Sequence, residues 1–404
     1  MGTATDNYNW RIGDYRGQDF GGITIAIKDL IDLQGVVTTA GSRLVASRAR
    51  KATKDANCLV RVRDERLTIV GKTNLTELAF GTTGINHWWG TPPNPIDPSL
   101  IPGGSSSGSV VAVTGGFANI ALGSDSGGSI RIPSAACGAY GLKTTWSRVS
   151  NEGVWPLAPS LDSIGPIAND MDGLAYGFGL LSKITDLAVS DRPLRVGLIS
   201  NSQDESFNSL FRSLVREVGW ELGEVKELDL RLAHEAASVI LVSEAARSNS
   251  KLFNELHRVD PVVRSRLLGA DEIADSEYVR ALRYRHSFAH LLDTEFERYD
   301  LLINATIPFD IPKLSNAYSK VLNTNTIPFN FSGNPALAIP LSVDFSSEVT
   351  GSKVSIQGGQ IDMPVPVSLQ VIAPMGSEEL LLFAGREIEC KGLSYLRSST
   401  RAIK

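Results

Sequence analysis

The chain has 404 residues, of which 42% are hydrophobic and 21% charged, and its net charge is −5. This composition is ordinary for a globular protein, and without a Lys/Arg-rich block it argues against a nucleic-acid surface. No stretch approaches 18 uninterrupted apolar residues, which excludes a transmembrane helix. The polar start has no secretory pattern and the three cysteines are scattered, so we expect a cytoplasmic protein with reduced thiols and without disulfides or a zinc site.

Two strands are predicted near the N-terminus. Isoleucines at 23, 25 and 27 alternate with smaller residues, and the segment ends at Lys28, which places this lysine on the small-residue face of the strand. Residues 66–74 form a second predicted strand. Residues 76–81 are predicted to be helical, and residues 82–104, rich in Pro, Asn, Gly and Trp, are predicted to be a loop.

A region rich in small residues follows this loop. Between Gly103 and Gly141, ten of 39 residues are glycine and eight are serine, with short apolar runs between them. A flexible linker would lack such runs, so the pattern indicates helices and strands that other backbone approaches closely. We therefore expect a crowded part of the core here.

The second half of the chain predicts a βαβ-like unit, a helical region and late strands. PLRVGLIS, ESFNSLFRSLVREVGW and VKELDL are typical of a strand, a helix and a returning strand, and residues 232–298 are strongly helical. Further strands are expected in YDLLINATIPF, NPALAIPLSV and VPVSLQVIAP, a last helix in SEELLLFAGREIE, and an exposed β-excursion at 346–364.

Two common catalytic and binding motifs match the sequence in part, but the residues around them do not fit. GKT at 71–73 would need a glycine at position 66 to form a phosphate-binding loop, and that residue is Arg66. GSSSG around Ser106 fits the nucleophile-elbow pattern, but a proline-rich loop stands where that motif needs a strand. Four of the five histidines lie in charged helical stretches far from the glycine-rich region, and His87 lies in a loop of aromatic residues. A serine nucleophile would therefore need another base.

Lys28 is the natural candidate for that base. Burial beside apolar or small residues lowers the pKa of a lysine and so favours the neutral amine. Lysines within buried strands are also rare. The alternative, that Lys28 pairs with Asp29 or Asp32 at the end of the strand, stays open on the pattern alone.

Three segments together resemble a known family: IAIKD, PGGSSSGS and GSDSGGSIRIPSAACGAYGLK. Lys28 precedes Ser105 by 77 residues, and Ser105 precedes Ser129 by 24. The segments and their spacing are similar to those of the amidase signature family of Ser-Ser-Lys hydrolases. GKTNLTELAFG and NFSGNPALAIPL extend the likeness over nearly the whole chain. The short segment before the lysine strand resembles compact members that act on small amides, such as indole-acetamide hydrolases and malonamidases.

The resemblance implies a catalytic role for three residues. Ser129 would be the nucleophile, Ser105 the bridging serine with a cis peptide bond before or at it, and Lys28 the base that draws the proton through Ser105. The run SVVAV would be a helix whose N-terminus points at the site. An oxyanion hole would come from four backbone N–H groups, those of Ser126, Gly127, Gly128 and Ser129.

Other residues would support or line this site. Asp125 and Arg131 bracket the nucleophile loop and are expected to form a buried pair that holds its curvature. Ala79, Phe80 and Ser105 would bind the substrate on its acyl side, and loop residues 86–89 would shape the entrance. The resemblance implies neither a metal nor a cofactor.

The expected fold is a single α/β domain over residues 1–404, with a mixed, largely parallel central sheet between helical layers. Residues 20–190 are expected to form the catalytic core and residues 195–330 a variable helical region that selects the substrate. Residues 331–404 would supply strands and a helix that return to the core.

Three functional hypotheses follow. The first is an amidohydrolase that converts a small or medium carboxamide to a carboxylate and ammonia or an amine; its partners would be a small-molecule amide, no nucleic acid and no membrane, with a homodimer as the candidate assembly. The second is the glutaminase-type A subunit of a tRNA-dependent amidotransferase, which needs a partner protein and which the short N-terminal segment argues against. The third is a non-catalytic binding relative, disfavoured because all three catalytic positions are intact.

Overall fold

The computed structural model describes residues 9–13, 15, 17–182, 192–200, 205–342 and 367–395. Within these residues the strands form one 11-stranded sheet in the order β1-β3-β2-β4-β6-β5-β10-β11-β9-β7-β8, so strands from both ends of the sequence share one sheet. The strands are β1 (Arg11–Ile12), β2 (Thr24–Lys28), β3 (Thr68–Thr73), β4 (Ile120–Asp125), β5 (Tyr140–Lys143), β6 (Ser163–Ala168), β7 (Arg195–Ile199), β8 (Glu221–Val225), β9 (Leu301–Ala305), β10 (Ala336–Pro340) and β11 (Ser368–Ile372).

The predicted α/β fold with a mixed sheet is confirmed, but the sheet is not largely parallel. In the described part of the chain, six of the ten strand pairings are antiparallel, and the parallel ones are those of β2 with β3 and β4 and of β7 with β8 and β9. The reason lies in the connections. A parallel pair needs a crossover, usually a helix, whereas residues 144–162 between β5 and β6 contain no helix and return the chain antiparallel.

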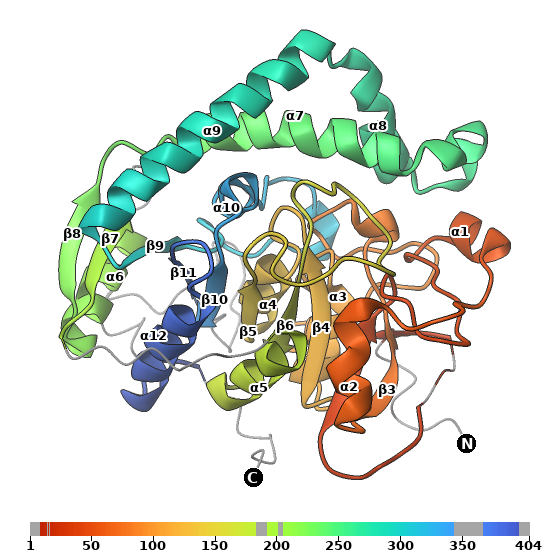
Figure 1. Cartoon of the computed structure of the whole chain (residues 1–404), viewed down its shortest axis with the longest axis horizontal. Coiled ribbons are helices and arrows are strands. Elements are labelled where there is room, and N and C mark those ends of the chain that lie inside the picture. The colour runs from red at the N-terminus through yellow and green to blue at the C-terminus, as the bar shows by residue number, and fades with distance from the viewer. Residues whose placement is uncertain are drawn as a thin grey trace.

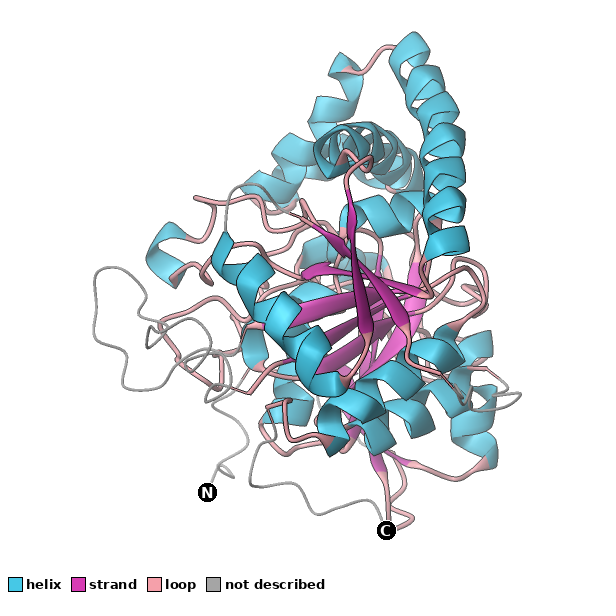
Figure 2. Ribbon diagram, turned by 90° about the vertical axis from the view of Figure 1, so that its left-hand side faces the viewer, coloured by secondary structure: helices cyan, strands magenta, loops and turns pink. Residues whose placement is uncertain are grey.

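Helices cover both faces of this sheet (Figures 1 and 2). α3 and α4 pack on one face against β4, β5 and β10, and α5 and α12 pack on the other. α7 packs along α9, and Figure 1 shows the pair arching over one side of the sheet, above α10. The helices are α1 (Arg43–Arg48), α2 (Val60–Asp64), α3 (Ser107–Thr114), α4 (Arg131–Cys137), α5 (Met171–Leu181), α6 (Glu205–Val218), α7 (Leu230–Ser248), α8 (Pro261–Leu268), α9 (Asp275–Arg298), α10 (Ile327–Ser332) and α12 (Glu378–Cys390).

The alternation predicted for the first strand is confirmed and decides where Lys28 points. Ile25 and Ile27 belong to the apolar cluster that includes residues of α1 and α2, whereas Ala26 packs with residues of α3 on the opposite face. Side chains two residues apart on a strand share a face. Lys28, at the end of β2, therefore follows Ala26 toward the glycine- and serine-rich segments.

Most predicted elements are confirmed, and two are wrong in their bounds or type. The returning strand is Glu221–Val225, which begins four residues before the predicted VKELDL segment and overlaps it only at Val225, and α7 already begins at Leu230. The segment expected to be helical at 76–81 contains only a 3₁₀ turn, Glu77–Ala79. The expected β-excursion at 346–364 lies outside the described residues, and the proposed division into a core, a helical region and a C-terminal return stays a prediction.

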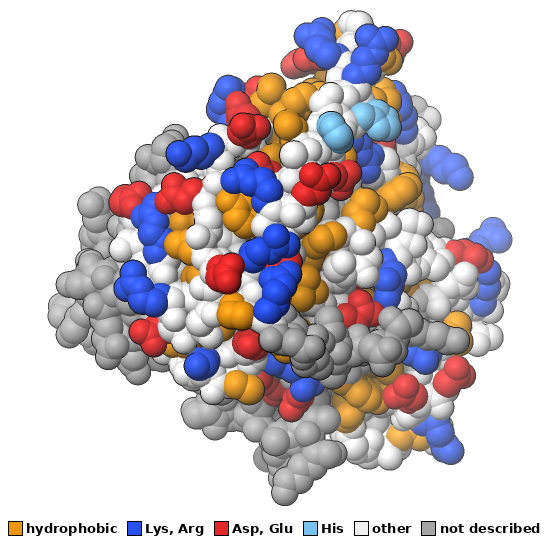
Figure 3. Space-filling view, turned by 60° about the vertical axis from the view of Figure 1, so that its left-hand side comes forward, with side chains coloured by type: hydrophobic (Ala, Val, Ile, Leu, Met, Phe, Trp, Pro, Cys, Tyr) orange, Lys and Arg blue, Asp and Glu red, His pale blue; other side chains and the backbone are white. Residues whose placement is uncertain are grey.

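The surface shows no strongly charged face in the view of Figure 3. There, basic and acidic side chains of the described residues are interspersed over the visible face, with apolar side chains between them. Among the described helices, none has the length and apolar character needed to cross a bilayer.

Candidate active site

Lys28 ends β2 as a fully buried side chain surrounded by hydroxyl groups. Its Nζ lies 2.9 Å from Ser105 Oγ, 2.8 Å from Ser106 Oγ and 2.8 Å from Ser124 Oγ. Sequence reasoning missed Ser106 and Ser124 as partners of Lys28, although they lie next to the predicted site residues Ser105 and Asp125 in the sequence. These three hydroxyl oxygens and the carbonyl oxygen of Ser124 (3.5 Å), all neutral, therefore surround this amine.

The alternative ion pair for Lys28 is wrong. Asp29 pairs with Lys72 instead, at 3.1 Å, and no carboxylate of the described residues lies within ion-pair distance of Lys28 Nζ. Burial lowers the pKa of Lys28 from 10.5 to about 7, although the charges of Asp125 and Asp162 partly oppose this shift. A large fraction of Lys28 is therefore a neutral amine at neutral pH.

A neutral Lys28 can take a proton from Ser105. A neutral amine has two N–H donors and one lone pair, so one of its three hydroxyl neighbours must donate to it. The Ser106 hydroxyl donates to the carbonyl oxygen of Ser124 (3.2 Å), which leaves it as an acceptor from the amine. Ser105 and Ser124 remain as the hydroxyls whose proton can point at Lys28 Nζ.

Ser105 and Ser129 approach each other through adjoining loops. The Gly104–Ser105 peptide bond is cis, as the resemblance implied. The predicted helix in SVVAV is α3, which begins two residues after Ser105. The N–H of Ser106 donates to the carbonyl oxygen of Ser129 (3.1 Å), which ties the two loops together, although the hydroxyls of Ser105 and Ser129 make no direct hydrogen bond.

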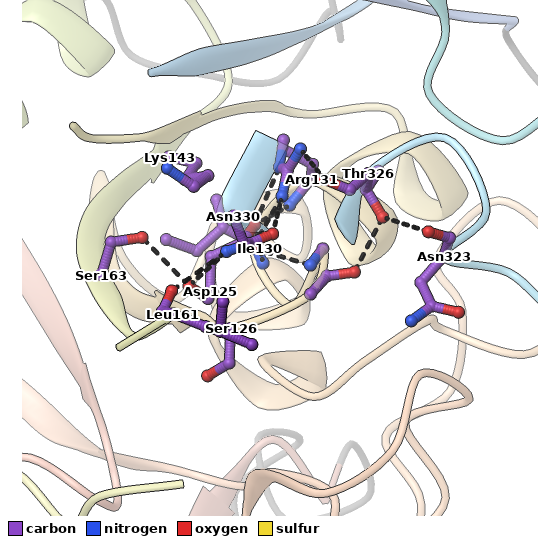
Figure 4. A network of polar contacts seen from close by, with 12 residues as sticks. Asp125, Ser126, Ile130, Arg131, Lys143, Leu161, Ser163, Asn323, Thr326 and Asn330 are labelled. Carbon is purple, nitrogen blue, oxygen red and sulfur yellow. Dashed lines mark hydrogen bonds and ion pairs between the residues drawn. The ribbon is translucent and has the colours of Figure 1, made fainter. Parts of the chain in front are cut away.

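The loop that carries Ser129 is built around the Asp125 carboxylate at the end of β4 (Figure 4). Oδ1 accepts from Arg131 Nη2 (2.9 Å), Asn330 Nδ2 (3.0 Å) and the N–H of Gly128 (2.7 Å). Oδ2 accepts from Arg131 Nε (3.0 Å) and the N–H of Ile130 (3.1 Å). The predicted buried pair is present, and one carboxylate organises both the loop and the start of α4.

The pKa values around this carboxylate follow from the same contacts. Burial alone would raise the pKa of Asp125, but the charge and hydrogen bonds of Arg131 outweigh it and hold the pKa well below its usual range. Lys143, at the end of β5, is also buried; burial and then the charge of Arg131 lower its pKa to about 7. Asp125 is therefore ionised in the folded protein at neutral pH.

Gly128 explains why the loop is made of small residues. Its φ is +123°, a region that L side chains rarely adopt, and an added Cβ would lie 2.3 Å from Thr326 Oγ1. Thr326 Oγ1 donates to the carbonyl oxygen of Gly127 (2.8 Å), so the Gly127–Gly128 peptide is held from both sides. Any residue other than glycine would break this arrangement.

The prediction that Gly128 belongs to the oxyanion hole is wrong. Its N–H donates to Asp125 Oδ1, because Thr326 and Asp125 together turn that peptide away from the substrate side. The N–H groups of Ser126, Gly127 and Ser129 have no hydrogen-bond acceptor within the described part of the chain. We keep these three as the proposed oxyanion hole.

Asp162, which sequence reasoning missed, holds the first residue of this loop. Its Oδ1 accepts from Ser126 Oγ (2.5 Å) and from the N–H of Ala158 (3.0 Å), and its Oδ2 accepts from the N–H of Leu157 (3.0 Å). The Ser126 hydroxyl is thereby occupied, which leaves that residue to act through its backbone. No pattern around Asp162 in the sequence points to this contact.

Removing the charge of Arg131 should destabilise the fold strongly. Arg131→Met leaves the Asp125 carboxylate buried without its cation, which costs about 3–5 kcal/mol in comparable pairs. Urea unfolding at pH 7 measures this cost. Asp125→Asn/Arg131→Met removes both charges and should be more stable than Arg131→Met alone, whereas a single-variant cost below about 1 kcal/mol would contradict the buried-pair assignment.

A pocket of about 310 Å³ opens beside Ser129, roofed by α7 and α8. The predicted residues Ala79 and Phe80 line it. His234 and Arg266 also line it, so the expectation that His234 lies far from the site is wrong. Helix packing brings both residues there from more than 100 positions away in the sequence. The predicted entrance residues 86–89 do not line this pocket; Asn86 instead donates to the carbonyl oxygens of Gly41 and Leu75.

The pocket beside Ser129 carries positive charge. Arg266 Nη1 donates to the carbonyl oxygen of Phe80 (2.8 Å), and no carboxylate of the described residues pairs with it. Lys320 lines the same pocket, while no acidic side chain does so in the part of the chain that the structure covers. Burial lowers the pKa of His234. The described residues also hold no cluster of three potential metal ligands, and Cys58, Cys137 and Cys390 form no disulfide with one another.

Comparison with known proteins gives consistent matches over almost the whole chain. A family model described as Amidase matches residues 6–382. The A subunit of glutamyl-tRNA(Gln) amidotransferase from Deinococcus radiodurans is 32% identical over 421 residues, covering 92% of this chain and 84% of that protein. 2-Amino-5-chloromuconic acid deaminase of Comamonas testosteroni is 30% identical over 403 residues, covering 93% and 85%. A crystal structure of an amidase superposes with a TM-score of 0.78 at 28% identity, over 91% of this chain and 84% of that one.

Proposed function

The chain belongs to the amidase family, a family of hydrolases that act on C–N bonds, and we propose that it hydrolyses a carboxamide through an acyl-enzyme on Ser129. One observation carries the proposal. The Nζ of a buried lysine with a pKa of about 7 lies 2.9 Å from Ser105 Oγ, and the loop of Ser105 is hydrogen-bonded to that of Ser129. A base, a proton relay and a nucleophile are thus within reach of one pocket.

The proposed acylation uses this relay in both directions. Neutral Lys28 takes the proton of Ser105 while Ser105 takes that of Ser129, and Ser129 Oγ attacks the amide carbonyl carbon. The oxyanion that forms would accept from the N–H groups of Ser126, Gly127 and Ser129. When the C–N bond breaks, the proton returns through Ser105 to the nitrogen, so ammonia or an amine leaves.

Deacylation would repeat the steps with water as the nucleophile. Water gives its proton to the Ser105–Lys28 relay and attacks the ester carbonyl. The ester C–O bond then breaks, Ser129 regains its proton, and the carboxylate leaves. No residue has to change role between the two half-reactions.

The charge of the pocket favours some amides over others. Arg266 and Lys320 line the pocket without an acidic neighbour in its lining, so a positively charged substrate would be repelled there. We propose a neutral or anionic carboxamide. The pocket volume of about 310 Å³ is at the small end of ligand sites and suits a small or medium molecule.

A second candidate function rests on the same chemistry. The 32% identity to the A subunit of an amidotransferase favours release of ammonia from glutamine within a complex with other proteins. The homodimer expected for the first hypothesis and this complex are alternative assemblies. Both functions need the Lys28–Ser105 contact, so the site alone does not choose between them.

Ammonia release by the purified chain separates the candidates. We expect the chain alone to release ammonia from neutral and anionic carboxamides, including short aliphatic amides and glutamine. Activity on glutamine that appears only when partner proteins are added supports the amidotransferase function. If no amide releases ammonia, with or without partner proteins, this result would contradict both functions and leave the non-catalytic hypothesis.

A further inference from the structure

A second pocket adjoins the one beside Ser129. It measures about 750 Å³ and lies where the parallel strands β7, β8 and β9 end, with residues of the α7 N-terminus and of the loop before α10 in its wall. We call it the strand-end pocket. His234, Lys320 and Val321 line both pockets, so the two share one wall. The carboxyl ends of parallel strands are where open α/β sheets bind ligands.

A hydrogen-bond chain from the nucleophile loop fixes the orientation of Asn304 in this pocket. Arg131 has only donors, so Gln370 must turn its Oε1 toward Arg131 Nη1, at 2.7 Å. Gln370 Nε2 then donates to Asn304 Oδ1 (2.8 Å). This leaves Asn304 Nδ2 as a donor without an acceptor in the part of the chain that the structure describes.

That unpartnered donor points to a ligand. Asn304 is only 1% exposed and lines the strand-end pocket, and its Nδ2 has no hydrogen-bond partner among the described residues. A buried amide N–H without an acceptor is costly unless something fills the place. An oxygen of a bound molecule would satisfy it.

The charges around the strand-end pocket favour an anionic oxygen. Of the two acids in its lining, Asp229 caps the N–H of Leu232 (2.9 Å) and lies 3.7 Å from Arg231. Lys320 lies over the Phe309 ring, and neither Lys320 nor Lys226 has a carboxylate at ion-pair distance among the described residues. Glu227 is the remaining acid in the lining, and the N-terminus of α7 adds positive potential.

From these observations we infer that the strand-end pocket binds a carboxylate, which belongs to the far end of the amide substrate. In this arrangement the scissile amide lies at Ser129. The flexible chain between the amide and the carboxylate passes His234 and Lys320, and the carboxylate reaches Asn304 Nδ2. This inference rests on the proposed function for its substrate part. The substrate class is a carboxamide with a carboxylate at the other end of a flexible chain. A separate small organic acid has the same chemistry, and the experiment distinguishes the two.

Kinetics on a length series tests the substrate part. Succinamate, adipamate and suberamate are each compared with the neutral diamide of the same length. Asn304→Asp keeps the acceptor for Gln370 and replaces the free donor by a charged oxygen, and Lys320→Gln changes an exposed loop residue that needs no refolding of the core. Lys391→Gln, at an exposed position after α12, is the matched control for a lost positive charge.

We expect the variants to lose kcat/KM selectively on the longer acids. Asn304→Asp and Lys320→Gln should each lower kcat/KM for adipamate or suberamate by about tenfold, the size of one lost charge-assisted hydrogen bond, and Asn304→Asp should leave the diamides within about twofold. Lys391→Gln should change neither. Equal losses on acids and diamides, or no loss on either, would overturn the substrate part.

Direct binding separates this inference from the proposed function. Calorimetry with suberate on the Ser129→Ala enzyme needs no turnover, so it stays informative if no amide is hydrolysed. Binding that is lost in Asn304→Asp or Lys320→Gln and that competes with propionamide supports the inference. Binding lost in these variants without such competition assigns the carboxylate to a separate molecule and overturns the substrate part. No binding, or binding unchanged in both variants, overturns the whole inference.

Discussion

Replacing Ser129 by alanine is expected to lower turnover of every carboxamide substrate by on the order of 10⁴-fold or more, because the other hydroxyl on the loop, that of Ser126, is held by Asp162. The fold should be unaffected, since the Ser129 hydroxyl makes no hydrogen bond with any described residue and lines the pocket. Steady-state ammonia release measures the activity, and circular dichroism with urea unfolding measures the fold.

The control for Ser129→Ala is Ser134→Ala on α4. Ser134 is a buried serine of the same segment, and its hydroxyl also has no hydrogen-bond partner within the described ranges. Its loss should leave activity within about twofold, since it takes no part in the relay. A folded Ser129→Ala enzyme with turnover like that of Ser134→Ala would rule out Ser129 as the nucleophile.

Replacing Lys28 by arginine should leave almost no activity at any pH. A guanidinium does not lose its proton in water, so the relay through Ser105 has no base. The loss expected for a general base is about 10²- to 10⁴-fold. In the unchanged enzyme, kcat/KM should rise as pH increases through about 7, because the pKa of Lys28 is lowered to about 7 and the neutral amine is the active form.

Two controls accompany this measurement. Lys28→Met has neither a charge nor a base and is similar in length to lysine, so it should be as inactive as Lys28→Arg if the proton-accepting amine is what matters. A pH–rate profile of Lys28→Arg that still rises toward alkaline pH with near-normal activity would contradict the base assignment. Unfolding curves of both variants show whether a loss arises from the fold.

The same pKa has a consequence for stability. In the unfolded chain the Lys28 amine keeps its ordinary pKa near 10.5, and in the fold the pKa is about 7. Between these values the unfolded state binds more protons, so the contribution of Lys28 to the free energy of unfolding rises with pH from about 7 to about 10. Below pH 7 burial of the charged amine opposes folding.

Local pattern predicted the face of β2 on which Lys28 lies, and the resemblance supplied Ser105 and Ser129 as its partners. Alternation along β2 placed Lys28 on the small-residue face, and that face meets the loops of Ser105 and Ser129. The resemblance then assigned their order in the relay. These features are set by neighbouring residues, so short segments of the sequence carry them.

The surroundings of the site depend on contacts between distant segments. His234 and Arg266 come from α7 and α8, and nothing next to them in the sequence says that these helices roof the pocket. The N–H of Gly128 turns toward Asp125 because Thr326, about 200 residues later, holds the preceding carbonyl. Tertiary packing decides both, which is why sequence reasoning missed them.

The predicted bounds of β8 and the predicted parallel direction of most strands were wrong for a related reason. β8 is an edge strand with Val225 as its only buried residue, so it has no apolar alternation to mark it. The direction of β5, β6, β10 and β11 depends on how their connections run through space. Apolar runs predict that these strands exist, but not which way they pair.

The central claim, that Lys28 is a neutral amine poised to activate Ser129 through Ser105, is tested most directly by titrating Lys28 itself. Heteronuclear NMR of enzyme with ¹⁵N-labelled lysine, with the signal assigned by its loss in Lys28→Met, follows the Nζ shift from pH 5 to 11. We predict a midpoint near pH 7. A midpoint close to 10.5, the ordinary lysine value, would mean a charged amine at working pH and would contradict the account.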